Sequence, residues 1–163
     1  AKSLRSHGQG KTYFYEHVGY CSRLDEIQAA ILRVKLNKLQ QWNDARRANA
    51  AYYMEAFAGL PLQLPASAPE NYHIYHQFTV RFARRDELKA KLQERGVGSG
   101  VYYPGALHLQ PAYLNMGYKE GDLPESERAA NEVLSLPILP ELSAEDREIV
   151  AKAVRQSVEE IMN

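Results

Sequence analysis

Residues 7–12 read HGQGKT, a string with two glycines that ends in lysine and threonine. The same residue types bind phosphates in nucleotide-binding loops, where a first glycine stands five residues before the glycine that precedes the lysine. Arg5 occupies that position here, and no strand-like stretch comes before it. We therefore interpret the string as a flexible glycine-containing loop and not as a nucleotide-binding loop.

Five histidines and one cysteine are the residues that could bind a transition metal or act as a nucleophile. His73 and His76 are three residues apart, and on a strand such residues point to opposite faces, so they cannot share one metal ion without a bend. Neither a second cysteine nor a carboxylate cluster completes a site. Cys21 has no nearby base that would activate its thiol. The pattern predicts no metal site and no catalytic residue.

Two tyrosines and a histidine follow the small-residue string GVGSG, as Tyr102, Tyr103 and His108. Glycine and serine let other groups approach the backbone closely. Phenol and imidazole groups that converge at a strand end can line a polar substrate pocket. The same side chains can equally pack in a core, and the spacing alone favours neither interpretation.

The overall composition excludes several classes of protein. The 163 residues include 20 basic and 20 acidic side chains, so the formal net charge is zero and no concentrated basic surface for nucleic acid or anionic lipid is expected. The single cysteine permits no internal disulfide, which is typical of a reducing compartment. No apolar run reaches membrane-spanning length, and the first ten residues do not resemble a signal peptide. These features favour a cytoplasmic location.

A long helix is the main element that the pattern predicts. Ser22 and Asp25 fit a capping box, so the helix is expected to begin at Arg23 and to end at Gly59. Two adjoining apolar stripes follow it, which predicts burial on more than one side. The stripes comprise Leu24, Ile27, Ile31 and Val34, and Leu32, Leu36, Leu39 and Trp42.

The remainder alternates between strands and helices, which predicts an α+β fold with a small, mainly antiparallel sheet. In the first strand Ile74, His76, Phe78 and Val80 should share one face, so His76 is expected to pack. The expected elements are a strand over 73–82, a helix over 83–96 closed by Gly96, a short strand over 101–103, a helix over 124–134, a strand and turn over 134–142, and a helix capped by Ser143.

Several blocks in register resemble the sugar-nucleotide aminotransferases of the DegT–StrS family, which use pyridoxal phosphate. The blocks are RSHGQ, GYCSRLDEIQAAIL, HIYHQFTVR with RRDEL, GVGSGVYYPGALHLQPAY, GDLPESE and EVLSLPILPEL. They cover nearly the whole chain. The resemblance implies the C-terminal part of a fold type I enzyme that transfers an amino group from glutamate to a keto-deoxysugar nucleotide.

The resemblance also implies a division of the chain. Residues 1–22 are expected to be a loop remnant of the large cofactor domain, 23–59 a long bridging helix, and 60–163 the small C-terminal α+β domain. None of the lysines stands in the family's context for the lysine that binds the cofactor covalently. The chain is therefore expected to be a fragment that does not transaminate alone, and the complete enzyme to be a homo-oligomer.

Six residues receive roles from the resemblance. Cys21, Ser22 and Arg23 match the segment that reaches the phosphate of pyridoxal phosphate in a partner subunit. The family usually has asparagine at position 21, and a thiol is a poorer donor, so Ser22 or backbone N–H groups at the helix start are expected to replace it. Tyr102, Tyr103 and His108 match the border of the sugar-nucleotide pocket. The alternative function is a non-catalytic assembly or sugar-nucleotide-binding module.

Overall fold

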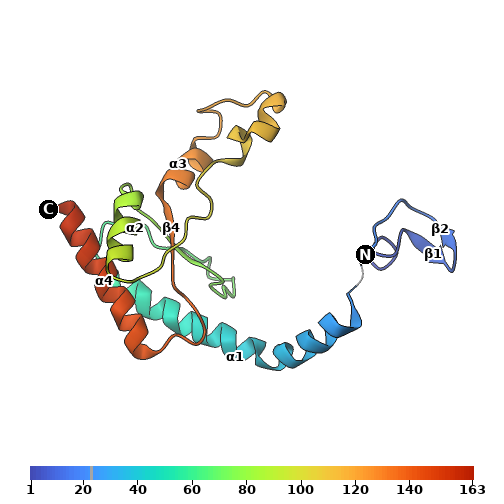
Figure 1. Ribbon diagram of the computed structural model, residues 1–163, viewed down its shortest axis with the longest axis horizontal. Helices are drawn as coiled ribbons and strands as arrows, with labels where there is room; N and C mark the ends of the chain where they lie inside the picture. Colours follow the sequence, from blue (N-terminus) through green and yellow to red (C-terminus); the bar gives the residue numbers. More distant parts are fainter. Residues whose placement is uncertain (23) are drawn as a thin grey trace. The chain divides into compact units, whose positions relative to one another are not determined.

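A computed structural model describes residues 1–22 and 24–163. The chain divides into two compact units, Ala1–Gln40 and Gln41–Asn163, and each is considered by itself (Figure 1). Within the described residues no helix has the length and apolar character needed to cross a membrane. In chain order the elements are β1 (Gln9–Lys11), β2 (Phe14–Tyr15), α1 (Glu26–Ala56), β3 (Phe78–Arg81), α2 (Arg85–Glu94), the 3₁₀ helices η1 (Leu107–Leu109) and η2 (Pro111–Met116), α3 (Pro124–Glu132), β4 (Val133–Leu136) and α4 (Ala144–Met162).

The first unit contains a small antiparallel hairpin where the sequence predicted only loop. Strands β1 and β2 pair Gln9 with Tyr15 and Lys11 with Phe14. The hairpin starts at Gly8, whose φ of 79° belongs to the left-handed region that favours glycine. The Gly8 carbonyl accepts the Glu16 N–H at 2.9 Å. This bond fixes the start of the hairpin to its end.

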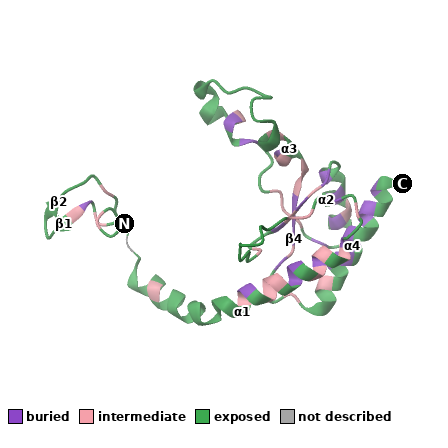
Figure 2. Ribbon diagram, turned by 180° about the vertical axis from the view of Figure 1, so that it is seen from behind, coloured by how far each residue is buried: buried purple, intermediate pink, exposed green. Residues whose placement is uncertain are grey.

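Helix α1 begins three residues later than predicted. The Asp25 carbonyl accepts the Ala29 N–H at 2.8 Å, so Asp25 and not Ser22 takes the N-cap position. The expected burial of two stripes is also wrong, because the apolar residues of the first half are exposed, as Figure 2 shows. The buried residues of α1, namely Asn43, Asn49, Ala50 and Tyr53, all lie in its second half. Periodicity identifies an apolar face but not what covers it.

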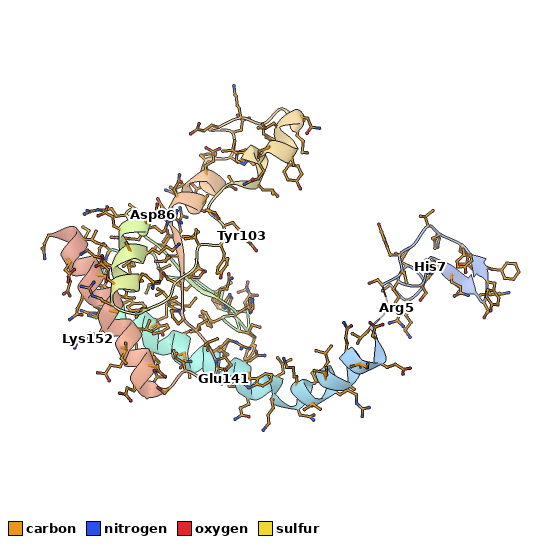
Figure 3. The ribbon with its side chains drawn as sticks, viewed as in Figure 1. Arg5, His7, Asp86, Tyr103, Glu141 and Lys152 are labelled. Carbon is orange, nitrogen blue, oxygen red and sulfur yellow. The ribbon has the colours of Figure 1, made fainter. Side chains whose placement is uncertain are left out.

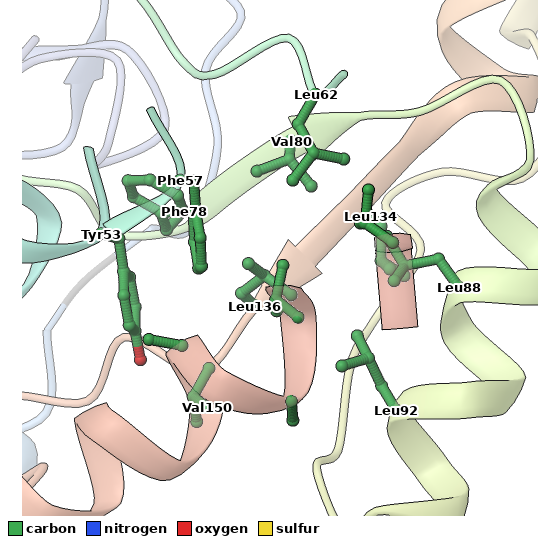
Figure 4. Close-up of a cluster of buried hydrophobic side chains, with 14 of the residues drawn as sticks. Tyr53, Phe57, Leu62, Phe78, Val80, Leu88, Leu92, Leu134, Leu136 and Val150 are labelled. Carbon is green, nitrogen blue, oxygen red and sulfur yellow. The ribbon is translucent and has the colours of Figure 1, made fainter. Parts of the chain in front are cut away.

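The second unit is built around the antiparallel pair β3 and β4, with Phe78 opposite Leu136 and Val80 opposite Leu134. The small antiparallel sheet is as predicted. Figure 4 shows Phe78 and Val80 pointing into a core that is closed by side chains from α1, α2 and α4. The strand itself is shorter than expected. Residues 73–77 are not part of it, and His76 is exposed, so its predicted packing was wrong.

The end of α2 before Gly96 and the start of α4 after Ser143 are as the sequence predicts, whereas α2 begins at Arg85, two residues later than predicted. Ser143 and Asp146 form a complete capping box, in which the Asp146 N–H donates to Ser143 Oγ at 3.0 Å. Gly96, with φ 75°, follows α2, and the Val97 N–H donates to the Leu92 carbonyl at 2.9 Å. Local chemistry fixes both boundaries.

Glu160 joins these two helices and gives stability a predictable pH dependence. Its carboxylate accepts from Lys91 Nζ at 2.8 Å and from Arg95, and these two cations hold the pKa of Glu160 below the usual glutamate range. In the unfolded chain the pKa returns to about 4.3. The ion pairs therefore stabilise the fold above that pH, and their contribution is lost as the pH falls through the lower folded pKa.

Glu160→Gln should lower the free energy of unfolding near neutral pH and flatten its decline in acid. Urea unfolding across a pH series measures both. Glu159→Gln is the matched control, since Glu159 makes no ion pair among the residues that the structure describes. Parallel pH curves for the wild type and Glu160→Gln would contradict the prediction.

Candidate functional site

An open cleft of about 490 Å³ lies beside β4. Its wall is mixed, with an imidazole, an amide, hydroxyl groups and backbone that suit a polar ligand carrying an apolar face. The residues that line it are His76, Gln77, Gly98, Ser99, Gly100, Tyr102, Ser135, Leu136, Pro137, Ile138 and Leu139. The cleft therefore combines the segment GVGSG with the end of the sheet.

Two hydrogen bonds attach the cleft wall to helix α1. Asn49 Nδ2 donates to the Leu139 carbonyl at 2.9 Å, and the Tyr53 hydroxyl donates to the Pro137 carbonyl at 3.0 Å. Burial raises the pKa of Tyr53, so its phenol stays protonated and keeps its role as donor. The buried half of α1 thereby holds the segment after β4 in place.

Tyr102 and Tyr103 are available to a ligand. They are 51% and 75% exposed, so neither packs in the core. Their rings meet edge to face with centroids 5.9 Å apart. A Cβ on Gly100 would lie 2.7 Å from the Tyr102 ring, so a residue larger than glycine at this position would displace the ring. Figure 3 places Tyr103 on the connection between the core and the 3₁₀ helices.

His108 has a different environment. Its side chain is 6% exposed, and its Nε2 lies 2.9 Å from Oε1 of Glu127 on α3. The Tyr118 ring meets it edge to face at 6.1 Å. His108 is not among the residues that line the cleft. The structure thus brings Tyr102 and Tyr103 together and gives His108 its own partner.

Glu127 is a residue that sequence reasoning missed. Its carboxylate accepts the N–H of Gly121 at 2.9 and 3.0 Å and that of Leu123 at 3.3 Å, in addition to its contact with His108. These bonds, first of all those from Gly121, hold the pKa of Glu127 below the usual glutamate range. The block GDLPESE could have indicated this role, because it places the Glu127 carboxylate in the first turn of a helix that follows a glycine-containing loop.

The remaining histidines of the 73–76 segment do not assemble a metal site. His73 Nδ1 accepts the Tyr75 N–H at 3.0 Å, and His76 lies in the cleft wall. Within residues 1–22 and 24–163, no three His, Cys, Asp or Glu side chains gather in a way that could hold a metal ion.

The segment predicted to reach a cofactor phosphate lies in the first unit. Cys21 is exposed, and its backbone forms an isolated antiparallel β-bridge with Ser6. The Ser22 N–H donates to the Arg5 carbonyl at 2.9 Å. Because α1 begins at Glu26, the helix N-terminus whose backbone N–H groups were expected to bind an anion is not at Ser22. The Ser22 hydroxyl and the Cys21 thiol are exposed and could each contact a phosphate group, but the two side chains alone do not form a complete cofactor site. Arg23 lies outside the described residues.

Comparison with curated proteins gives relatives of which this chain spans only a part. A pleiotropic regulatory protein of Geobacillus stearothermophilus is 46% identical over 156 residues, which are 94% of this chain and 42% of that protein. A dTDP-3-amino-3,4,6-trideoxy-alpha-D-glucose transaminase of Streptomyces venezuelae is 45% identical over 161 residues, 98% of this chain and 42% of that enzyme. A UDP-N-acetyl-3-dehydro-alpha-D-glucosamine 3-aminotransferase of Acidithiobacillus ferrooxidans is 40% identical, again over 42% of its length.

Solved structures agree with this similarity. The chain superimposes on DesV of Streptomyces venezuelae with a TM-score of 0.91 at 45% identity, over 97% of this chain and 43% of that one. A DegT DnrJ EryC1 StrS aminotransferase of Brucella abortus gives a TM-score of 0.86 at 38% identity, over 96% and 42%. The sequence model of one family matches residues 1–155. The chain belongs to the DegT/DnrJ/EryC1/StrS aminotransferase family.

Proposed function

We propose that this chain is the C-terminal portion of an aminotransferase that moves an amino group from glutamate to a keto-deoxysugar nucleotide. The observation that carries the proposal is the family match over residues 1–155, together with relatives named as dTDP-sugar and UDP-sugar transaminases. The chain spans 42% of these relatives. The proposal therefore concerns the part that this portion plays in a longer enzyme.

We further propose a role for each part. Residues 1–22 belong to the cofactor domain, 23–59 bridge the domains, and 60–163 form the small domain of a cytoplasmic homo-oligomer. Helix α1, at Glu26–Ala56, supports the bridging role, because its second half packs in the core while its first half exposes apolar side chains. Those exposed side chains are suited to contact with a further domain or subunit.

The ligand contacts follow the same division. We propose that three residues contact the nucleotide sugar: Tyr102, which lines the cleft, its exposed neighbour Tyr103, and His108. Cys21, Ser22 and Arg23 are proposed to contact the phosphate of pyridoxal phosphate, with the Ser22 hydroxyl as the better donor of the two described residues. When bound, pyridoxal phosphate supplies the carbonyl carbon that carries the amino group between the two substrates. No residue of this chain is assigned the covalent step.

A chimera tests the proposal. This chain replaces the matching 161 residues of the Streptomyces venezuelae transaminase, and amine formation on that relative's keto-sugar nucleotide is followed by mass spectrometry. We expect turnover within about a hundredfold of the parent, because small misplacements of binding groups cost up to that factor. The chain alone, given the same substrates and cofactor, should not turn over. Turnover by the isolated chain, or a folded chimera without activity, would contradict the proposal.

A second function, a non-catalytic assembly or sugar-nucleotide-binding module, is favoured by one observation. Ile27, Ile31 and Val34 share one face of the first half of α1 and are 78%, 55% and 72% exposed. Such a contiguous apolar surface promotes association. A chimera that folds and binds the nucleotide sugar but does not transaminate would favour this second function over the first.

A further inference from the structure

The contact between His108 and Glu127 has a feature that the proposed function does not use, which is the location of its proton. A neutral imidazole carries hydrogen on one ring nitrogen and offers the other as an acceptor. The partner of the ring determines which nitrogen is which. Nε2 is the ring nitrogen of His108 that has a hydrogen-bond partner among the described residues.

The surroundings of Glu127 decide where the proton lies. Its Oε1 faces the N–H groups of Gly121 and Leu123 as well as His108 Nε2, and its Oε2 faces Gly121 again. Backbone N–H groups can only donate, so they favour the ionised carboxylate. An ionised carboxylate has no proton to give. The hydrogen between the two side chains must therefore be on His108 Nε2.

Burial makes this arrangement specific. The side chains of His108 and Glu127 are 6% and 16% exposed, so water competes weakly for the bond between them. The Tyr118 ring packs edge-on against the imidazole and limits its rotation. With Nε2–H directed at Glu127, Nδ1 is left as the acceptor of the neutral ring.

We propose that Glu127 is a positioning residue that fixes His108 as the Nε2–H form, so that Nδ1 accepts a hydrogen bond from a hydroxyl of the nucleotide sugar. This inference rests on the proposed function, which gives His108 its contact with that ligand. It also determines which sugar group His108 recognises: Nδ1 can bind a hydrogen-bond donor such as a hydroxyl, but not a group that can only accept.

The first experiment uses the chain without ligand. Long-range ¹H–¹⁵N spectra recorded over a pH series report which ring nitrogen carries hydrogen in the neutral imidazole. The His108→Gln spectrum identifies the His108 signals among those of the five histidines. We expect the Nε2–H form in excess by about tenfold or more, since a bond to a charged acceptor is stronger than one to a neutral acceptor. In Glu127→Gln the excess should fall by about tenfold. Nδ1–H as the main form in the wild type would overturn the proposal.

The second experiment titrates dTDP-glucose into the chain and into three variants. His108→Gln keeps a donor that reaches Glu127 but has no group at the Nδ1 position. His108→Gln should therefore weaken binding about fivefold, the worth of one hydrogen bond. Glu127→Gln should weaken it about twofold, because the fraction of the Nε2–H form falls from about nine tenths to about one half. Glu125→Gln is the matched control, because Glu125 is an exposed carboxylate on the same helix and, among residues 1–22 and 24–163, pairs only with Arg128. It should bind like the wild type.

The outcomes separate the inference from the proposed function. Unchanged affinity in His108→Gln, with the fold intact by circular dichroism, would overturn the assignment of Nδ1 to the ligand. Failure of both the wild type and the folded chimera to bind dTDP-glucose would contradict the proposed function. The free-chain spectra would in that case still decide whether Glu127 fixes the proton on Nε2.

Discussion

Phe78→Ala should lower the free energy of unfolding of the Gln41–Asn163 unit by about 3–5 kcal/mol, the usual cost of removing a buried aromatic ring. Phe78 is completely buried. Its ring meets Tyr53 edge-on at 5.3 Å, and it also lies near Phe57 at 6.3 Å. Removing it leaves a cavity where β3 contacts α1, at the centre of the only extensive core among the described residues.

Urea unfolding followed by circular dichroism measures the effect of Phe78→Ala. Phe14→Ala is the matched control, because it removes the same side chain from a position that is 72% exposed. We expect less than about 0.5 kcal/mol for Phe14→Ala, as for most surface substitutions. Equal effects of the two variants would mean that the core of the second unit is not where its stability lies.

Gly8→Ala should disrupt the first unit, at a cost of about 3 kcal/mol. A left-handed conformation alone costs an alanine about 1–2 kcal/mol. The new Cβ would also lie 1.7 Å from the backbone oxygen of His17. A backbone atom cannot avoid this overlap by a change of rotamer, as a side chain could. Relief of this overlap requires the chain to move, which breaks the bonds between the Gly8 carbonyl and the N–H groups of Glu16 and His17.

Amide hydrogen exchange provides the measurement, and protection of the Glu16 and His17 N–H groups should disappear in Gly8→Ala. Gly59→Ala is the control. Gly59 has nearly the same φ, 80°, but nothing lies within 4 Å of its Cβ position. It should therefore show only the conformational cost of about 1–2 kcal/mol. Retained protection at Glu16 in Gly8→Ala would show that the turn tolerates the methyl group.

Boundaries set by local chemistry were predictable from the sequence. Ser143 with Asp146, and Gly96 after α2, satisfy backbone groups within a few residues, so the sequence contains all the partners that matter. The alternation of Phe78 and Val80 likewise identified the buried face of β3. His76 continued that alternation in sequence but not in structure, because no pairing extends the strand beyond Phe78.

Features that depend on distant partners were not predictable. The pairing of His108 with Glu127 joins residues 19 positions apart through a loop whose path no periodicity describes. Tyr102 and Tyr103 were open to two interpretations until their exposure was known. The apolar stripes of α1 were visible in the sequence, but burial depends on which surface meets them, and the large apolar side chains of the first half of the helix are exposed. The ligand roles of Tyr102, Tyr103, His108, Cys21, Ser22 and Arg23 stay predictions.

The bonds from Asn49 and Tyr53 to the backbone after β4 couple one wall of the cleft to helix α1. Both donors lie within the Gln41–Asn163 unit, so the shape of the cleft depends on how the buried half of α1 packs in the core of that unit. A substitution that shifts this half of the helix is therefore expected to alter the cleft even when the substituted residue lies outside the cleft wall.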